Sequence, residues 1–301
     1  MKRFYSNGKL LLTGEYAVLD GALSLAVPTK YGQSLIVETI DEPKIIWKSI
    51  DKKGEVWFED EFSIEEIATS NTPCNDVRER LVQILNAAKQ LNSEFLSDNK
   101  GFKVTTELDF PKKWGLGTSS TLINNISQWA EVDAYMLLEN TFGGSGYDIA
   151  CAQHNTPIIY QIKNRKPEVQ EVNFNPSYRE HLYFVHLNKK QNSRDGIKYY
   201  HENKEHSKYA ISKINQITKK MANCNALKDF ENLIISHENI ISKLTKQTPV
   251  KDLLFPDFEG CIKSLGAWGG DFILVTSTEN PSSYFKQKGF ETIIPYKDMV
   301  L

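Results

Sequence analysis

The sequence has few cysteines, and none of them stands in a spacing that binds metal or forms a redox pair. Its 301 residues include four cysteines, and no two are close in sequence. There is no C-x-x-C pair, and the six histidines show no metal-ligand spacing either. We therefore expect free thiols in a reducing compartment, without a disulfide framework or a zinc site.

The chain also lacks a long apolar run and an excess of charge of one sign. Nowhere do about 18 apolar residues follow one another, so no membrane span is expected. The first residues contain no apolar segment followed by a cleavage site, which argues against a secretory signal. A formal net charge of -2 gives no global basic field for nucleic acid. We expect a cytoplasmic protein with no membrane partner and no nucleic-acid partner.

Composition and patterning are those of a folded α+β protein. Hydrophobic residues make up 40% and charged residues 25%, and the length suits one large domain or two modest ones that share a cleft. Strand-like and helical patterns alternate without regular βαβ units. Strand-like runs occupy residues 9–12, 16–19, 34–39, 44–58, 102–108, 157–162, 182–187 and 272–276. Helical spacing occupies residues 76–91, 122–138 and 198–244.

A loop rich in glycine and hydroxyl residues, Gly115 to Ser120, lies between a predicted strand and a predicted helix. Glycine lets a backbone approach a ligand closely, and amides at a helix N-terminus point at bound anions. The loop lacks the Gly-Lys-Ser/Thr ending of a Walker A motif. Taken alone, it is better explained as a tight turn with Ser/Thr capping.

Three other segments of the sequence stand out together with this loop. They are residues 8–19, which contain Gly14-Glu15-Tyr16, residues 144–148, which read Gly-Ser-Gly-Tyr-Asp, and residues 265–272, which contain Gly-Ala-Trp-Gly-Gly-Asp. Taken in their order along the chain, the four segments resemble the signature of the GHMP kinases, named for galactokinase, homoserine kinase, mevalonate kinase and phosphomevalonate kinase. The Gly-Tyr-Asp-Ile-Ala string is similar to a distinct subgroup of that family. The resemblance spans nearly the whole chain.

The resemblance implies a two-domain α+β fold. Residues 1–176 would form an ATP-binding domain like ribosomal protein S5 domain 2, and residues 177–301 a ferredoxin-like domain. ATP and the substrate would bind in the cleft. The implied activity is ATP-dependent phosphorylation of a hydroxyl or phosphate group on a small metabolite.

Site residues follow by matching position to position. Lys9 and Asp148 stand where the family has its catalytic lysine and aspartate, although a strand-end lysine and a helix N-cap are the structural alternatives. Ser119 matches the hydroxyl on the Mg²⁺ side. The nucleotide would be bound by Lys113, Gly115, Leu116, Gly117, Thr118, Ser119 and Ser120.

The carboxylate that would hold Mg²⁺ is not assigned. At the spacing where many family members have glutamate, this chain has Leu137. Glu139 and Asp133 are nearby alternatives, and a solvated helix face explains both of them better.

The acceptor is expected to be mevalonate or phosphomevalonate. Gly14-Glu15-Tyr16 is similar to phosphomevalonate kinases, whereas Asn192-Ser193-Arg194 resembles a segment of mevalonate kinases. Substrate contacts are therefore expected from Glu15, Tyr16, Ser193, Arg194 and Gly269. A phosphorylated acceptor would need a basic cluster, for which Lys112, Lys113, Lys189 and Lys190 are candidates.

Two other functions remain open at this point. One is a decarboxylase similar to diphosphomevalonate decarboxylase, and the other is a non-catalytic binding protein with the same fold. The presence of both Lys9 and Asp148 argues against the second. A homodimer also remains open as the state of assembly.

Overall fold

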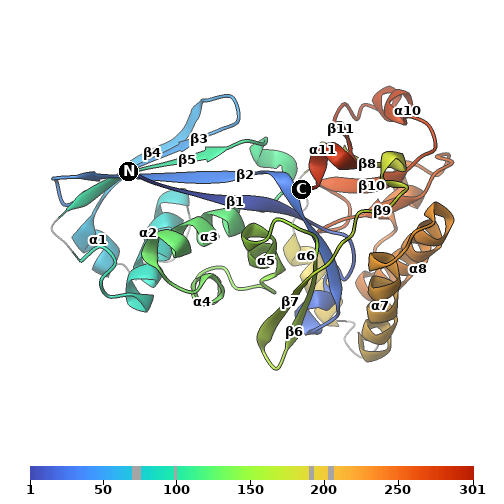
Figure 1. The fold of residues 1–301 in the computed structure, drawn as a ribbon, viewed down its shortest axis with the longest axis horizontal. Coiled ribbons are helices and arrows are strands. Elements are labelled where there is room, and N and C mark those ends of the chain that lie inside the picture. The colour runs from blue at the N-terminus through green and yellow to red at the C-terminus, as the bar shows by residue number, and fades with distance from the viewer. Residues whose placement is uncertain (70–75, 98–99, 190–192, 203–206) are drawn as a thin grey trace. The chain divides into compact units, whose positions relative to one another are not determined.

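The structure is a computed structural model that describes residues 1–69, 76–97, 100–189, 193–202 and 207–301. The chain forms two compact units that alternate along the sequence (Figure 1). The first unit comprises Met1–Gly8, Tyr31–Lys112 and Gly117–Gln153, and the second comprises Lys9–Lys30, Lys113–Leu116 and His154–Leu301. The sequence boundary expected at residue 176 remains a prediction.

The sheet of the first unit has the strand order β4-β3-β5-β2, and β1 also pairs with β2. The strands are β1 (Lys2–Leu11), β2 (Ser24–Ile40), β3 (Lys44–Ile50), β4 (Val56–Ser63) and β5 (Gly101–Leu108). β5 runs antiparallel to β2 and parallel to β3. Alternate residues of β3 are buried, among them Ile45 and Trp47, so one face of this strand packs into the core.

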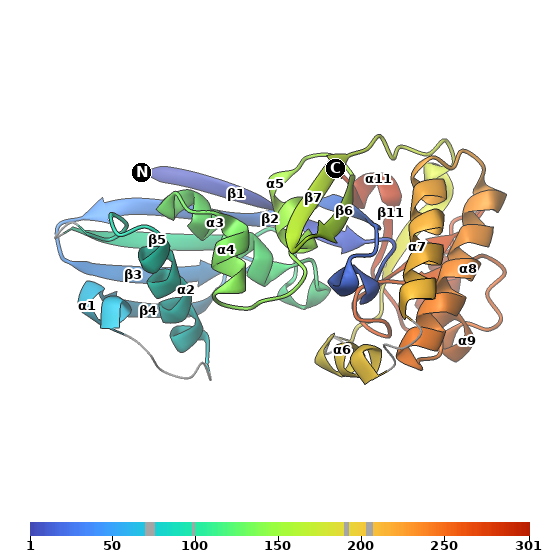
Figure 2. The ribbon, with the colours of Figure 1, turned by 90° about the horizontal axis from the view of Figure 1, so that it is seen from below.

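Helices of the first unit cover one side of this sheet (Figure 2). They are α1 (Ile64–Thr69), α2 (Val77–Leu91), α3 (Thr118–Ala130), α4 (Ala134–Glu139) and α5 (Tyr147–Gln153). Asp76 begins α2, because its carboxylate accepts a hydrogen bond from the Glu79 amide. Trp47, Ile84 and Trp129 belong to one hydrophobic core between the helices and the sheet. That core holds α3, whose N-terminus follows the glycine-rich loop, against the strands.

The second unit contains a smaller sheet with the order β11-β8-β10-β9, in which every pair is antiparallel. Its strands are β8 (Leu182–His186), β9 (Ile262–Ser264), β10 (Phe272–Thr276) and β11 (Ile293–Pro295). A hairpin of β6 (Ile158–Lys163) and β7 (Lys166–Glu171) pairs with the first residues of β2. All five residues of β10 are buried, which suits a central strand.

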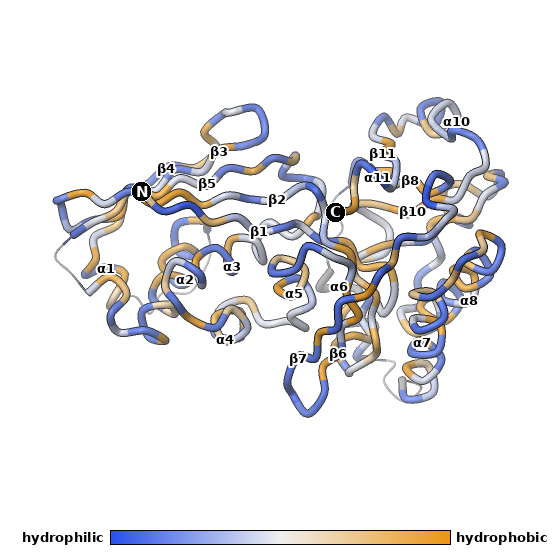
Figure 3. Tube along the Cα trace, in the orientation of Figure 1, coloured by the Kyte–Doolittle hydropathy of each residue, from blue (hydrophilic) through white to orange (hydrophobic). Residues whose placement is uncertain are grey.

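The longest helices of the second unit, α7 and α8, pack side by side (Figure 2). The helical elements are η1 (Ala17–Asp20), η3 (Arg179–His181), α6 (Ser193–Glu202), α7 (Ser207–Ala222), α8 (Leu227–Thr245), α9 (Val250–Leu254), α10 (Ser282–Gln287) and α11 (Tyr296–Met299). Both hydrophobic and hydrophilic residues occur along α7 and α8 (Figure 3). Ile214 and Ile241 lie in a core shared with Tyr16 and Trp268.

Most elements expected from the sequence are present, and the α+β class is confirmed. The expectation of a strand at residues 16–19 was wrong, because Ala17–Asp20 form the 3₁₀ helix η1. The backbone turns there because Gly14 and Tyr16 have φ values of 88° and 60°, which no strand accommodates. The predicted helix over residues 122–138 is interrupted at Glu131, which also has a positive φ, and the helical stretch expected over residues 198–244 is interrupted between Ala222 and Leu227. No helix in the described parts of the chain is long and apolar enough to span a membrane.

Leu137 is fully buried in the core of the first unit, while its neighbour Met136 is 52% exposed on the same short helix. A carboxylate at 137 would therefore lie in the core and lose its hydration. We expect Leu137→Glu to lower the free energy of unfolding by at least about 3 kcal/mol, measured by urea denaturation. Met136→Glu is the control and should change stability by less than about 0.5 kcal/mol. Equal stability of both variants would contradict this packing.

Candidate functional site

Lys9 lies in the part of β1 that belongs to the second unit, beside two residues of the glycine-rich loop. Its amide donates to the Leu116 carbonyl at 3.0 Å, and its Nζ donates to the Gly115 carbonyl at 3.3 Å. The side-chain bond connects positions 106 residues apart in the sequence. The structure thus brings together two of the segments that the sequence singled out, and it directs the lysine side chain at the loop.

The loop residues of the second unit rest on an aromatic cluster. The buried Trp114 ring makes an edge contact with Phe272 at a centroid distance of 5.4 Å, and His186 contacts the same phenylalanine at 5.1 Å. The His186 Nε2 also lies 3.2 Å from the Lys113 carbonyl oxygen. Lys113 itself is exposed, so its ammonium is available to solvent and to anionic ligands.

In the first unit, Gly117 precedes α3 with a left-handed φ of 93°. No side chain caps this helix, so its first amides are left for water or a ligand. The Ser120 hydroxyl donates to the Gly117 carbonyl at 2.8 Å and is buried, whereas Ser119 is exposed. Among the loop hydroxyls, that of Ser119 is therefore the better placed for an external ligand, while that of Ser120 closes the helical turn.

Asp148 lies in the first turn of α5 in the first unit, and its side chain is half-buried. The helix begins with the bond from the Ala150 amide to the Gly146 carbonyl. Gly146 has a positive φ of 83°, which explains the glycine in the Gly-Tyr-Asp string. Lys9 and Asp148 belong to different units, and their joint role in catalysis remains a prediction.

Tyr16 connects the Gly14-Glu15-Tyr16 segment to the Gly266–Gly270 loop within the second unit. Its hydroxyl donates to the Ala267 carbonyl at 2.8 Å, and its ring stacks on Tyr200 at 6.4 Å. Gly269 lies in that loop with a φ of 109°. The structure therefore brings two predicted segments together here too, whereas direct contact of Tyr16 or Gly269 with a substrate stays a prediction.

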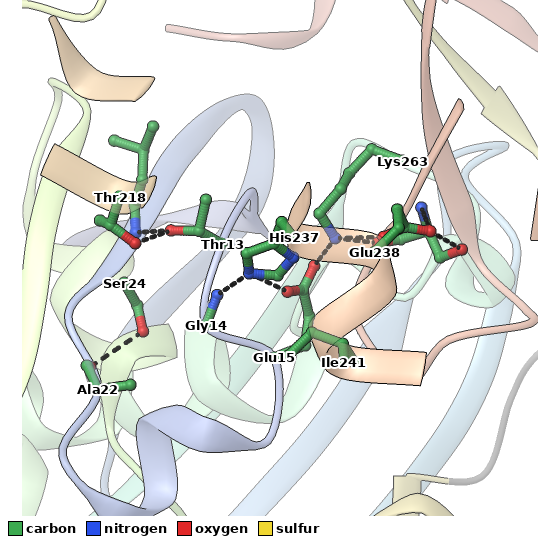
Figure 4. A network of polar contacts seen from close by, with 12 residues as sticks. Thr13, Gly14, Glu15, Ala22, Ser24, Thr218, His237, Glu238, Ile241 and Lys263 are labelled. Atoms are coloured by element: carbon green, nitrogen blue, oxygen red, sulfur yellow. Dashed lines mark hydrogen bonds and ion pairs between the residues drawn. The ribbon is translucent and has the colours of Figure 1, made fainter. Parts of the chain in front are cut away.

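Glu15 lies in a buried ionic network of the second unit (Figure 4). Its carboxylate is 2.5 Å from Lys263 Nζ and 3.5 Å from His237 Nε2, and Lys263 is also 3.0 Å from Glu238. Glu15, Lys263 and His237 are each at most 1% exposed. The Gly14 amide donates to His237 Nε2 at 3.0 Å, so the ring accepts at that nitrogen. The predicted substrate contact of Glu15 remains untested, but its observed partners are internal.

The electrostatics of the network follow from burial and from the nearby charges. Burial raises the pKa of Glu15 to about 7, although Lys263 opposes the shift. Burial would lower the pKa of Lys263, but Glu15 and Glu238 outweigh it and raise that pKa. Burial, and then Lys263, lowers the pKa of His237 well below its usual value. The histidine is therefore neutral near pH 7, and the lysine is the cation that the carboxylates surround.

The same turn is also fixed by hydrogen bonds of Thr13 and by close packing at Gly14. Thr13 and Thr218 share a hydroxyl hydrogen bond at 2.8 Å, and the Thr13 hydroxyl also accepts from the Leu25 amide (Figure 4). Gly14 has a φ of 88°, and a Cβ there would collide with the Ser24 hydroxyl. Glycine is thus required at 14 for both conformation and space.

Several predicted residues contribute no contact that can be described. Asn192 and Lys190 lie outside the described residues, as do the side chains of Ser193 and Arg194 at the start of α6. Asp133 caps α4 by accepting from the Tyr135 and Met136 amides, which accounts for its carboxylate without a metal. Within the described residues, no group of three or more His, Cys, Asp or Glu side chains could hold a metal ion.

A cavity of about 640 Å³ lies elsewhere in the second unit. It is lined by residues of β7, the segment after it and the C-terminal helix, including Glu171, Arg179 and Lys297. None of the residues predicted from the sequence as site residues lines it. The chemistry indicated by the motifs therefore does not depend on this cavity.

Sequence reasoning missed Lys263, His237 and Glu238. The sequence contains only a weak signal for Lys263, which lies beside Ser264 between the apolar residues Ile262 and Leu265. A lysine on a buried strand needs a buried partner. The partner could not be identified, since Glu15 lies 248 positions away.

We expect Lys263→Met to destabilise the protein strongly, because it leaves Glu15 and Glu238 buried without a cation. The free energy of unfolding should fall by about 3–5 kcal/mol, measured by urea denaturation. Lys48→Met, which removes an exposed pair with Glu59, is the control and should cost less than about 1 kcal/mol. A similar loss in both variants would show that burial of Lys263 is not what matters.

The network also predicts opposite pH dependences for two variants. The raised pKa of Glu15 gives stability that is lost as pH rises toward 7, and the lowered pKa of His237 gives stability that is lost as pH falls below its usual value. Lys263 acts on the pKa of both groups, and Glu238 acts on the pKa of Glu15. When the pH is raised from about 5 to about 7, the free energy of unfolding should increase by about 2 kcal/mol more in Glu15→Gln than in wild type. In His237→Gln it should rise less steeply than in wild type. Urea unfolding at three pH values measures both slopes, and unchanged slopes would contradict the assignment.

Comparison by sequence finds no counterpart for this chain. No protein-family profile matches it, and no curated protein matches it significantly.

Comparison by structure finds full-length neighbours. Phosphomevalonate kinase from Streptococcus pneumoniae, solved with phosphomevalonate and AMPPNP, has a TM-score of 0.73 at 14% identity and covers 97% of this chain and 99% of its own. Mevalonate kinase from Methanococcus jannaschii has a TM-score of 0.70 at 16% identity, with 97% and 96% covered. Galactokinase from Lactococcus lactis, complexed with galactose, has a TM-score of 0.67 at 13% identity, with 95% and 88% covered. These neighbours are GHMP kinases, and this chain has the two-domain α+β fold of that family.

Proposed function

We propose that this protein is a GHMP-type kinase that transfers the γ-phosphoryl group of ATP to a small metabolite. The acceptors that we favour are mevalonate and phosphomevalonate. The observation that carries the proposal is the conformation of consecutive residues Gly115 to Ser120, together with a fold shared over nearly the whole chain with kinases. Gly115 and Gly117 both have positive φ values, and α3 follows directly without a side-chain cap. Such a segment can present backbone amides to phosphate oxygens.

Phosphoryl transfer relies chiefly on positioning and charge neutralisation. Lys9 supports this proposal because its ammonium is held at the Gly115 carbonyl by hydrogen bonding. Its charge would lower the energy of phosphate oxygens bound at the loop. Asp148, by its position in the Gly-Tyr-Asp string, would accept the acceptor proton or orient the hydroxyl. Lys113, exposed beside Trp114, would add positive charge.

A divalent cation fits this arrangement as a partner of the nucleotide. Mg²⁺ in kinase sites is usually bound by one or two protein groups together with phosphates and waters, so it needs no cage of several carboxylates. The exposed Ser119 hydroxyl at the start of α3 is one suitable group. When bound, the cation would neutralise phosphate charge, while loop amides and Lys9 hold the same phosphates in place.

An anionic acceptor is favoured by the exposed lysines next to the loops. Lys189 is exposed, and its carbonyl accepts from the Asp271 amide at 2.7 Å, so it lies beside the Gly266–Gly270 loop. Lys113 is exposed beside the glycine-rich loop. These charges suit a carboxylate or phosphate on the acceptor.

A coupled assay of ADP release tests the activity. The purified protein should turn over ATP with mevalonate or phosphomevalonate and much more slowly with homoserine or simple sugars. Release of CO₂ together with ADP would instead identify a decarboxylase. Failure to turn over ATP with any of these compounds would count against the proposal and favour a binding protein.

Asp148→Asn tests the catalytic assignment. We expect kcat to fall by about 10²–10⁴-fold, because a positioned proton acceptor or orienting group contributes about that much. Glu59→Gln, on exposed β4 of the same unit, is the matched control and should retain wild-type kcat. Unchanged turnover in Asp148→Asn would remove Asp148 from the mechanism.

A further inference from the structure

The carboxylate of Asp271 lies against the glycine-rich loop inside the second unit. Both of its oxygens are 2.6 Å from the point that a Cβ atom at Gly115 would occupy. Gly115 has a φ of 66° and carries the carbonyl to which Lys9 Nζ donates. Glycine at 115 therefore leaves the space that the Asp271 carboxylate fills.

The backbone of Asp271 is held in place independently of its side chain. Its amide donates to the Lys189 carbonyl at 2.7 Å, and its carbonyl accepts from the Leu187 amide at 2.8 Å. The residue has a φ of 54° and directly precedes the buried strand β10. These two hydrogen bonds fix the backbone from which the Asp271 carboxylate reaches Gly115.

A carboxylate at this place is unfavourable for a loop that binds phosphate by itself. The carboxylate and the phosphate oxygens carry like charges and would repel each other at close range. A divalent cation between the carboxylate and the phosphates turns this repulsion into attraction. A carboxylate with phosphate oxygens and waters is also the ligand set that Mg²⁺ prefers in kinases.

We propose that Asp271 is the carboxylate that holds the nucleotide-bound divalent cation, directly or through a water molecule. The inference rests on the proposed kinase function and deepens it. It supplies a role that position 137 does not fill, since Leu137 is buried in the core of the first unit. The carboxylate comes instead from the Gly266–Asp271 segment, where the sequence departs from a run of small residues.

Binding of AMPPNP with and without Mg²⁺ tests the proposal without requiring turnover. In wild type, millimolar Mg²⁺ should tighten AMPPNP binding by at least about tenfold relative to EDTA. In Asp271→Asn the tightening should fall below about threefold, because the cation loses its protein ligand. AMPPNP without metal should bind Asp271→Asn as tightly as wild type or more tightly, since the repulsion is gone. Titration with Mn²⁺, followed by electron paramagnetic resonance in the presence of AMPPNP, should show weaker Mn²⁺ binding in the variant.

The control is Asp257→Asn, which removes a carboxylate bonded to Tyr284 and Lys288 on the surface of the same unit. It should keep the wild-type response to Mg²⁺. If Asp271→Asn does not fold, Asp271→Gly replaces it, because glycine adopts the positive φ without strain.

Each outcome decides between distinct conclusions. The same Mg²⁺ response in Asp271→Asn and wild type would overturn the assignment and leave the kinase proposal intact. So would tighter binding of AMPPNP to the variant by the same factor with and without Mg²⁺, which would mean that Asp271 acts only through its negative charge and not as a ligand of the cation. Binding of AMPPNP to wild type without any effect of Mg²⁺ would also overturn the assignment. No binding of AMPPNP to wild type under either condition would overturn both proposals.

Discussion

The buried ion pair between Lys263 and Glu15 is the interaction on which the arrangement of the second unit depends. Both groups are almost completely removed from water, and a charge in such a place is tolerated only when its partner is present. Glu15 belongs to the turn that follows β1, and Lys263 belongs to β9. The pair therefore fixes the turn that carries Glu15 against the sheet that carries Lys263. If either the turn or β9 were misplaced, a buried charge would lack its partner.

The ion pair between Lys263 and Glu15 also helps, indirectly, to fix the positions of Lys9 and Tyr16. Lys9 precedes the turn on β1 and reaches the Gly115 carbonyl, while Tyr16 follows it and bonds to Ala267. The two contacts lead to the two loops that carry Gly115 and Asp271. A buried ion pair away from these loops thus helps to set where the loop residues that we propose to bind the nucleotide are held. A site arranged in this way is pre-organised by packing and by charge before any ligand binds.

The sequence was sufficient for the fold class and for most elements, because periodic apolar residues and glycine-rich turns are local signals. The helix from Val77 to Leu91, with its Asp76 cap, is one such case. The sequence also singled out the segments that the structure joins within the second unit. Local pattern failed at residues 16–19, where an apolar run resembles a strand but the positive φ of Tyr16 starts a 3₁₀ turn. It also failed for Lys263 and Asp271, whose partners are distant in the chain and leave no spacing to recognise.

The order of synthesis gives the buried network a further consequence. Thr13, Gly14 and Glu15 are made before their partners Thr218, His237 and Lys263, which follow 205, 223 and 248 positions later. Such distant pairing is slow, because a large loop must close before the contact stabilises it. Until the ribosome has synthesised the chain through β9, the apolar stretch around Ala17 and Val18 has no core to pack into. A nascent chain that stalls before β9 would therefore expose this segment, and chaperones would be expected to recognise it there.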